Sequence, residues 1–121
     1  MTNDKMTTDQ IRDLALAALD DLKAKDVQVL DVRKLTSITD YMIVASGTSS
    51  RHVKAIADNV ALKAKAAGHP PLSVEGEREA EWILVDLFDV VVHVMLPDTR
   101  AFYQLEKLWE FDAAQERKTR A

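Results

Sequence analysis

The longest apolar run of the sequence covers residues 82–96. It is interrupted by three polar residues only: Asp86, Asp89 and His93. The run is long for one strand and short for a helix that crosses a membrane, and its β-branched residues favour strands. Two strands, 82–87 and 90–96, joined by a tight hairpin turn, are therefore predicted. Neither strand alternates cleanly between polar and apolar residues, so both are expected to be buried on two faces at the centre of a sheet.

Two other segments have the apolar spacing of helices that pack one face against a core. In residues 9–25, apolar side chains recur every three or four positions: Ile11, Leu14, Ala15, Ala18, Leu19 and Leu22. A capping box, Thr7-Thr8-Asp9-Gln10, precedes this helix. A second helix carries the same kind of stripe: Val53, Ile56, Ala57, Val60, Ala61 and Ala64. Gly68 occupies the left-handed position that ends this second helix.

The remaining apolar segments predict three more strands and a last helix. The strands cover residues 27–32, 41–45 and 72–75, and Pro97-Asp98 caps the last helix. Three residues share one face of that helix: Phe102, Leu105 and Trp109. Residues 112–121 are polar and are expected to form a flexible tail. The chain is predicted to be a single α/β domain, residues 1–121 with a core of about 9–110, built on a mixed sheet of about five strands flanked by helices.

Composition narrows the range of functions. A chain of 121 residues can bury a core without staples, and the lack of cysteine excludes disulfides and cysteine-ligated metal. A net charge of −4 argues against non-specific nucleic-acid binding, which needs a concentrated positive surface. No signal peptide and no membrane span is evident. We therefore expect a globular domain located in the cytoplasm. Direct, sequence-specific contact with nucleic acid is not expected either.

The turn Ser46-Gly47-Thr48-Ser49-Ser50-Arg51, between a strand and a helix, is a candidate anion site. Free backbone N–H groups and the helix dipole converge at such a helix start. The turn has neither the glycines of a dinucleotide-binding loop nor the Gly-Lys of a P-loop. A helix cap by Thr48 or Ser49 is the preferred interpretation. The sequence also contains no Asp-x-Asp pair, which argues against metal-dependent nucleotidyl transfer.

None of the three histidines has a second histidine at a ligand-like spacing. His93 lies in an apolar strand and is expected to be a neutral, hydrogen-bonded core residue. A Ser–His–acid arrangement of Ser46, His93 and Asp40 stays open at this point, but no nucleophile elbow supports it. The sequence therefore predicts no catalysis, no cofactor and no metal site.

Five blocks of sequence, spread in order over about residues 9–110, form a specific combination. They are 37–53, Val74-Glu75-Gly76, Trp82-Ile83-Leu84-Val85-Asp86, Asp89-Val90-Val91-Val92-His93-Val94 and 100–109. Together they resemble the ribosomal silencing factor family, also called RsfS or Iojap. The resemblance implies a nucleotidyltransferase-like fold without the catalytic carboxylates, which agrees with the missing Asp-x-Asp pair.

The resemblance also implies a function. Members of that family are translation repressors, not enzymes: they bind protein fourteen of the large ribosomal subunit and sterically block joining of the small subunit. A homodimer away from the ribosome is plausible by the same resemblance. The alternative from another class is a nucleotide- or anion-binding enzyme that uses the turn Ser46–Arg51.

The resemblance places partner binding on the first half of the long apolar run. The family's partner-binding tryptophan falls on Trp82 and its nearby leucine on Leu87. Asp86 and Asp89 flank the turn and could meet basic residues of the partner, although aspartate is also common in turns. Phe88 stands where many members have glycine, which puts the conformation of the turn in question and could add an aromatic to the contact. By itself, an isolated tryptophan at this position would be expected to pack against a helix.

Overall fold

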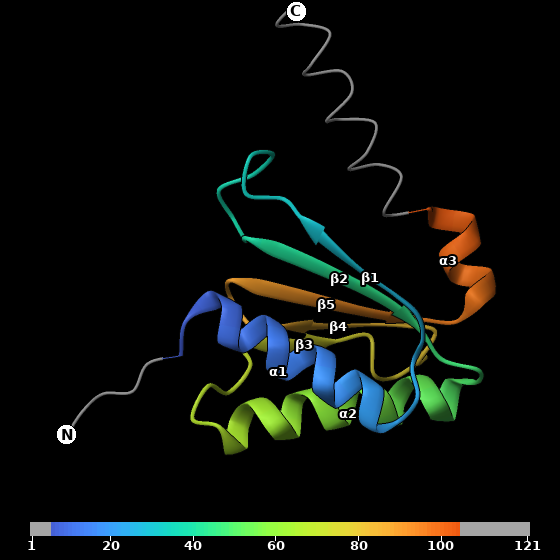
Figure 1. The fold of residues 1–121 in the computed structure, drawn as a ribbon. Helices are drawn as coiled ribbons and strands as arrows, with labels where there is room; N and C mark the ends of the chain where they lie inside the picture. The colour runs from blue at the N-terminus through green and yellow to red at the C-terminus, as the bar shows by residue number, and fades with distance from the viewer. Residues whose placement is uncertain (1–5, 105–121) are drawn as a thin grey trace, which may run out of the picture.

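The computed structural model describes residues 6–104, which form one α/β domain of three helices and five strands (Figure 1). The elements follow the predicted order along the chain: α1 (Thr8–Asp21), β1 (Lys25–Asp31), β2 (Tyr41–Ser46), α2 (Ser50–Ala66), β3 (Ser73–Glu75), β4 (Trp82–Asp86), β5 (Val90–Met95) and α3 (Pro97–Tyr103). The predicted fold class is therefore confirmed. No helix in this part of the chain has the length and apolarity needed to cross a membrane.

The five strands form one mixed sheet in the order β1-β2-β5-β4-β3. Strands β2 and β5 pair in parallel, and the other three pairs are antiparallel. Strand β5 occupies the centre, as predicted, and all but one of its residues are buried. The expectation for β4 is wrong, because burial alternates along it: Ile83 and Val85 are buried whereas Trp82, Leu84 and Asp86 are half-buried. Every second residue of β4 thus lies on the other face of the sheet.

Helices α1 and α2 lie side by side against one face of the sheet (Figure 1). The predicted stripes form the core there, together with alternate residues of the strands, although Leu14, Leu22 and Ala61 are only partly buried. The Asn59 side chain of α2 donates a hydrogen bond to the Ala18 carbonyl of α1, at 2.9 Å. Neither α1 nor α2 packs on the opposite face, which we call the open face, and α3 stands at one end of the sheet (Figure 1).

The starts of α1 and α2 agree with the predicted caps, but the end of α1 differs from the prediction. Thr7 and Gln10 form the capping box of α1, and Ser49 caps α2. Helix α1 ends at Asp21 and not at Lys25, because Lys23 turns into the left-handed region (φ 58°) and the chain enters β1 at once. Gly68 is left-handed (φ 85°) as predicted.

The last helix starts differently from the prediction. Its N-cap residue is Leu96, which forms no side-chain cap, and Pro97 occupies the first turn, where the missing N–H costs nothing. Phe102 is 78% exposed, so it does not pack into the core. The rest of the predicted stripe, Leu105 and Trp109, and the predicted tail 112–121 lie outside the described residues.

Candidate protein-binding surface

The open face of β4 presents three side chains in a row, Trp82, Leu84 and Asp86, which we call the β4 strip. The alternation of the strand places them on one side, while Ile83 and Val85 enter the core under the helices. Antiparallel pairing sets each beside a residue of β5: Trp82 opposite Met95, Leu84 opposite His93 and Asp86 opposite Val91. Leu84 was missed by sequence reasoning, although a period of two counted from Trp82 would have found it.

Trp82 is fixed in position by two neighbouring rings. Its indole N–H donates a hydrogen bond to Nδ1 of His93 at 2.9 Å, and the two ring centres lie 5.9 Å apart. The ring centre of Tyr103 from α3 lies 5.0 Å from that of Trp82, and Phe102 meets Tyr103 edge-on with ring centres also 5.0 Å apart. Tyr103 and Phe102 are both exposed. A half-buried tryptophan held this way is ordered before it meets a partner, which lowers the entropy lost on binding.

His93 is the neutral, hydrogen-bonded core residue that was predicted. Only 7% of it is exposed, and this burial lowers the pKa of its imidazole to about 4. The indole N–H of Trp82 can only donate, so Nδ1 of His93 must accept. The proton of the neutral ring therefore resides on Nε2.

In the turn between β4 and β5, the side chain of Leu87 does not lie on the surface where the contact was predicted. The Leu87 side chain is fully buried (0% exposed), so in this structure it supports the turn from inside and cannot contact a partner. Its carbonyl accepts a hydrogen bond from Nε2 of His69 at 2.8 Å. The family resemblance had placed Leu87 in the contact. Along the hairpin, however, buried residues alternate with partly exposed ones, and Leu87 falls on the buried side.

Phe88 occupies the tip of this turn and is 59% exposed. It adopts the left-handed conformation (φ 76°) that glycine would take without strain. Its backbone N–H donates to Oδ1 of Asp86 at 2.8 Å, so Asp86 stabilises the turn as well as lying on the strip. Asp89 instead accepts a hydrogen bond from Oγ1 of Thr8 at 3.0 Å, which directs it toward the start of α1.

The predicted site residues therefore do not form one cluster. Trp82 lies at one end of β4, whereas Phe88 and Asp89 lie at the turn beyond its other end. Leu84 and Asp86 connect these two ends along the open face. The candidate surface is a strip along a strand and not a compact patch at a turn.

Gly76, the last residue of the Val74-Glu75-Gly76 block, lies against the backbone of Trp82. Gly76 has a φ of 91°, and a Cβ on it would lie 2.1 Å from the Trp82 carbonyl oxygen. Any larger residue would thus push the start of β4 away. The block therefore positions the backbone of Trp82.

The turn that was considered as an anion site is a helix cap in the structure. Oγ of Ser49 accepts from the N–H of His52 at 3.1 Å, and the N–H of Thr48 donates to Nδ1 of His52 at 2.8 Å. Nε2 of that imidazole then donates to the Leu22 carbonyl at 2.7 Å. The backbone N–H groups of Thr48 and His52, which an anion would need, thus already donate to side chains of this turn. This favours the cap interpretation.

A Ser–His–acid arrangement is not formed. Asp40 and Ser46 stand at opposite ends of β2, and Oγ of Ser46 accepts a hydrogen bond from Arg100 at 2.9 Å. The Asp40 carboxylate lies near Thr8 at the far end of the strand. Within residues 6–104, no three His, Cys, Asp or Glu side chains lie close enough together to hold a metal ion.

The fold and surface define a class first: a small α/β domain with helices on one sheet face and a fixed tryptophan on the other. Comparison with known proteins then gives the family. The model of the family described as "Ribosomal silencing factor during starvation" matches residues 5–121. The chain belongs to the ribosomal silencing factor family.

Curated relatives and solved structures agree with this assignment. The chain is 51% identical over 104 residues to the ribosomal silencing factor RsfS of Chromobacterium violaceum, covering 86% of this chain and 85% of that protein. It is 42% identical to RsfS of Bacillus subtilis, covering 86% and 88%. A crystal structure of a C. violaceum protein superposes with a TM-score of 0.85 at 50% identity, covering 87% and 88% of the two chains. A mouse relative named mitochondrial assembly of ribosomal large subunit protein 1 is 36% identical, with 80% of this chain covering 44% of that protein.

Proposed function

We propose that this protein is a translation repressor that binds the large ribosomal subunit with the β4 strip and sterically blocks joining of the small subunit. Protein fourteen of the large subunit is the proposed point of contact, and the cytoplasm is the proposed place of action. The contact residues are Trp82, Leu84 and Asp86, with Phe88 at the end of the strip. Binding rather than catalysis is then the whole function.

The observation that carries this proposal is the fixed Trp82 on the open face, in a chain of this family. Tryptophans are over-represented among the few residues that supply most of an interface's binding energy. Leu84 adds apolar area next to it, and Asp86 adds a charge that can select a basic partner. Asp89 is left out of the contact set because it bonds Thr8.

Co-sedimentation with purified large subunits tests the proposal. Trp82→Ala should raise the Kd measured from the bound fraction by about thirtyfold or more, because truncating a central aromatic typically removes about 2 kcal/mol or more of binding free energy. Small subunits added first should compete with the wild-type protein for the large subunit. Circular dichroism should show that the variant stays folded.

Leu62→Ala provides the matched control, because Leu62 is a well exposed apolar residue on α2, away from the open face. It should bind as the wild type does. Full binding by Trp82→Ala, or equal loss in both variants, would contradict the assignment of the β4 strip. A homodimer off the ribosome stays a prediction, to be tested by sedimentation equilibrium of the free protein.

A further inference from the structure

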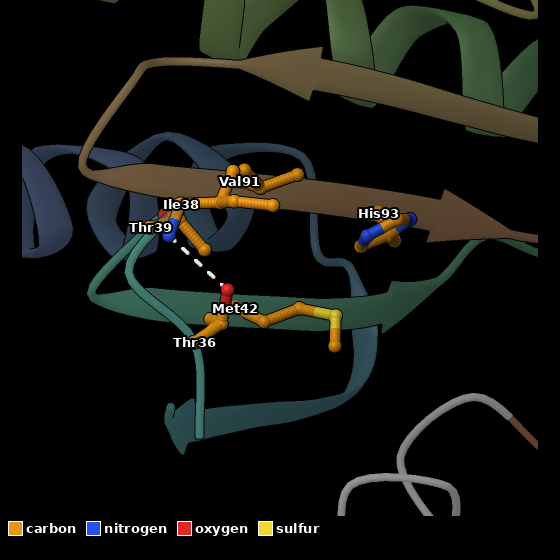
Figure 2. Close-up of a pocket in the computed structure, with 6 residues that line it drawn as sticks. All are labelled: Thr36, Ile38, Thr39, Met42, Val91 and His93. Atoms are coloured by element: carbon orange, nitrogen blue, oxygen red, sulfur yellow. Dashed lines mark hydrogen bonds between the residues drawn. The ribbon is translucent and has the colours of Figure 1, made fainter. Parts of the chain in front are cut away.

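A pocket of about 160 Å³ opens on the open face of the sheet, next to the β4 strip (Figure 2). Six residues line it: Thr36, Ile38, Thr39, Met42, Val91 and His93. Met42 of β2 and Val91 of β5 are paired in register and form its floor, and the connection between β1 and β2 supplies the first three residues. The pocket is thus built between a rigid sheet and a loop.

The walls of the pocket are apolar where they face the cavity. The hydroxyl of Thr36 accepts from the N–H of Ile38 at 3.1 Å (Figure 2), and the hydroxyl of Thr39 donates to the Tyr41 carbonyl at 3.4 Å. Both hydroxyls are therefore directed to the backbone. Ile38 lies at the rim and is 80% exposed. A mostly apolar lining with one polar group is typical of a small-molecule site.

His93 supplies one polar atom to this pocket. Nδ1 is bonded to Trp82, so the proton resides on Nε2, and within residues 6–104 that N–H has no hydrogen-bond partner. The ring is more than nine-tenths buried, and Figure 2 shows it at one end of the pocket with a ring nitrogen on the side of the other lining residues. Buried donors are normally paired, so an unpaired donor on a residue that lines a cavity favours a ligand that brings an acceptor.

We propose that this pocket binds a small uncharged ligand with an apolar body and one oxygen acceptor, which takes the N–H of His93 Nε2. A cavity of about 150 Å³ accommodates a six-membered ring, so the body is of that size. A charged ligand is disfavoured, because no charged side chain lines the pocket and desolvation would oppose it. The pocket adjoins the β4 strip, and His93 contacts both, because its Nδ1 accepts the hydrogen bond of Trp82.

Titration of the ¹⁵N-labelled full chain with cyclohexanone tests this site by NMR. This probe is a neutral ring of about seven non-hydrogen atoms with a carbonyl acceptor, and ligands of that size bind in the millimolar range. Saturable shifts are expected at the amides of Ile38, Thr39 and Val91 and at the indole N–H of Trp82, which is bonded to the same imidazole. The Nε2 nitrogen of His93 should shift with the same binding curve.

Three variants separate the parts of the proposal. Val91→Phe fills the pocket and should abolish binding, whereas Leu62→Phe adds the same ring on α2 and should bind cyclohexanone as the wild type does. His93→Phe keeps a planar ring but removes the donor, and should weaken binding about fivefold. If this last variant does not fold, the Nε2 shift in the wild type decides the role of the donor.

Three outcomes would overturn the proposal. They are no saturable shift in the wild type, equal binding by Val91→Phe, and a Nε2 resonance of His93 that does not move while the amides do.

Discussion

The two faces of the sheet are made of different residues and do different work. The face under α1 and α2 consists of aliphatic side chains that are fully buried, such as Ile43, Ile83 and Val92. The open face carries Trp82, Leu84 and Val91, each only partly covered, beside buried Met42 and Val44 and a buried histidine. The covered face therefore holds the larger core, and the open face combines a smaller core with apolar side chains that a partner or ligand can reach.

The contrast is sharpest along β4, where consecutive residues belong to opposite faces. Two variants one position apart can therefore separate stability from contact. In most proteins a binding residue and a core residue differ in element, exposure and backbone environment at once. Here the backbone environment is shared, so the difference between the two effects is attributable to the face.

The largest effect is expected from Ile83→Ala. Ile83 is fully buried among the helices, so its truncation should lower the free energy of unfolding by about 2–5 kcal/mol. Leu84→Ala should lower it by only about 1 kcal/mol, because Leu84 is only partly buried and its truncation leaves no closed cavity. Urea unfolding measures both values.

The same pair should rank the opposite way in binding. Leu84→Ala should weaken co-sedimentation with large subunits, while Ile83→Ala, assayed at a temperature where it stays folded, should bind as the wild type does. Equal stability losses for the two variants would show that the open face is packed as tightly as the covered one.

The second effect concerns pH and the only histidine of the open face. The unfolded chain protonates this imidazole near pH 6.5, whereas burial lowers the pKa of His93 to about 4 in the folded state. Between these values the unfolded state binds more protons, so the free energy of unfolding falls as the pH is lowered. The loss should reach about 2 kcal/mol at pH 5 and about 3 kcal/mol at pH 4.

His93→Gln isolates this contribution, because the carboxylates and the other two histidines remain in the variant. Its stability, measured by urea unfolding from pH 7.5 to 4, should depend less steeply on pH below 6.5. Parallel curves for the two proteins would mean that folding does not lower the pKa of His93.

Most of the fold was predictable because it depends on local patterns. The stripes of α1 and α2, the capping box at Thr7 and the left-handed Gly68 each follow from a few neighbouring residues. The end of α1 at Asp21 was not predictable, since the apolar stripe continues to Leu22 and only the tertiary path of the chain into β1 decides the break. Propensity is weak evidence at such a boundary.

The candidate site was predictable only in part, because the faces of a strand depend on what covers them. Trp82 and Asp86 lie on one face of β4, and their role in binding stays a prediction, whereas Leu87 was assigned to the contact although its side chain is buried. An apolar run gives no sign of which residues face helices and which face solvent. The pocket is beyond sequence reasoning altogether, since it joins a loop residue, Ile38, to His93 across two strands.

A smaller effect should separate the backbone of the turn from its side chain. The left-handed φ of Phe88 is strained for a residue with a Cβ. Phe88→Gly should therefore raise the free energy of unfolding by about 0.5–1 kcal/mol. Phe88→Ala keeps the strain and should bring no such gain. If the ring contacts the partner, both variants should lose the same binding to large subunits in co-sedimentation, whatever their stability. A gain in stability by the alanine variant would instead indicate that the exposed ring, and not φ, is the unfavourable part.

The smallest effect should come from the charge at the end of the strip. Asp86→Asn keeps an oxygen that can accept the N–H of Phe88, so the turn should hold and stability should change by less than about 0.5 kcal/mol. The lost charge should slow association with large subunits about threefold at low salt, and the difference should vanish at about 0.5 M salt. Glu75→Gln, an exposed charge of the neighbouring β3, gives the matched control and should change the rate less. Equal slowing by both variants would mean that the acidic residues of this surface attract the partner together through long-range electrostatics, and that Asp86 makes no specific contribution.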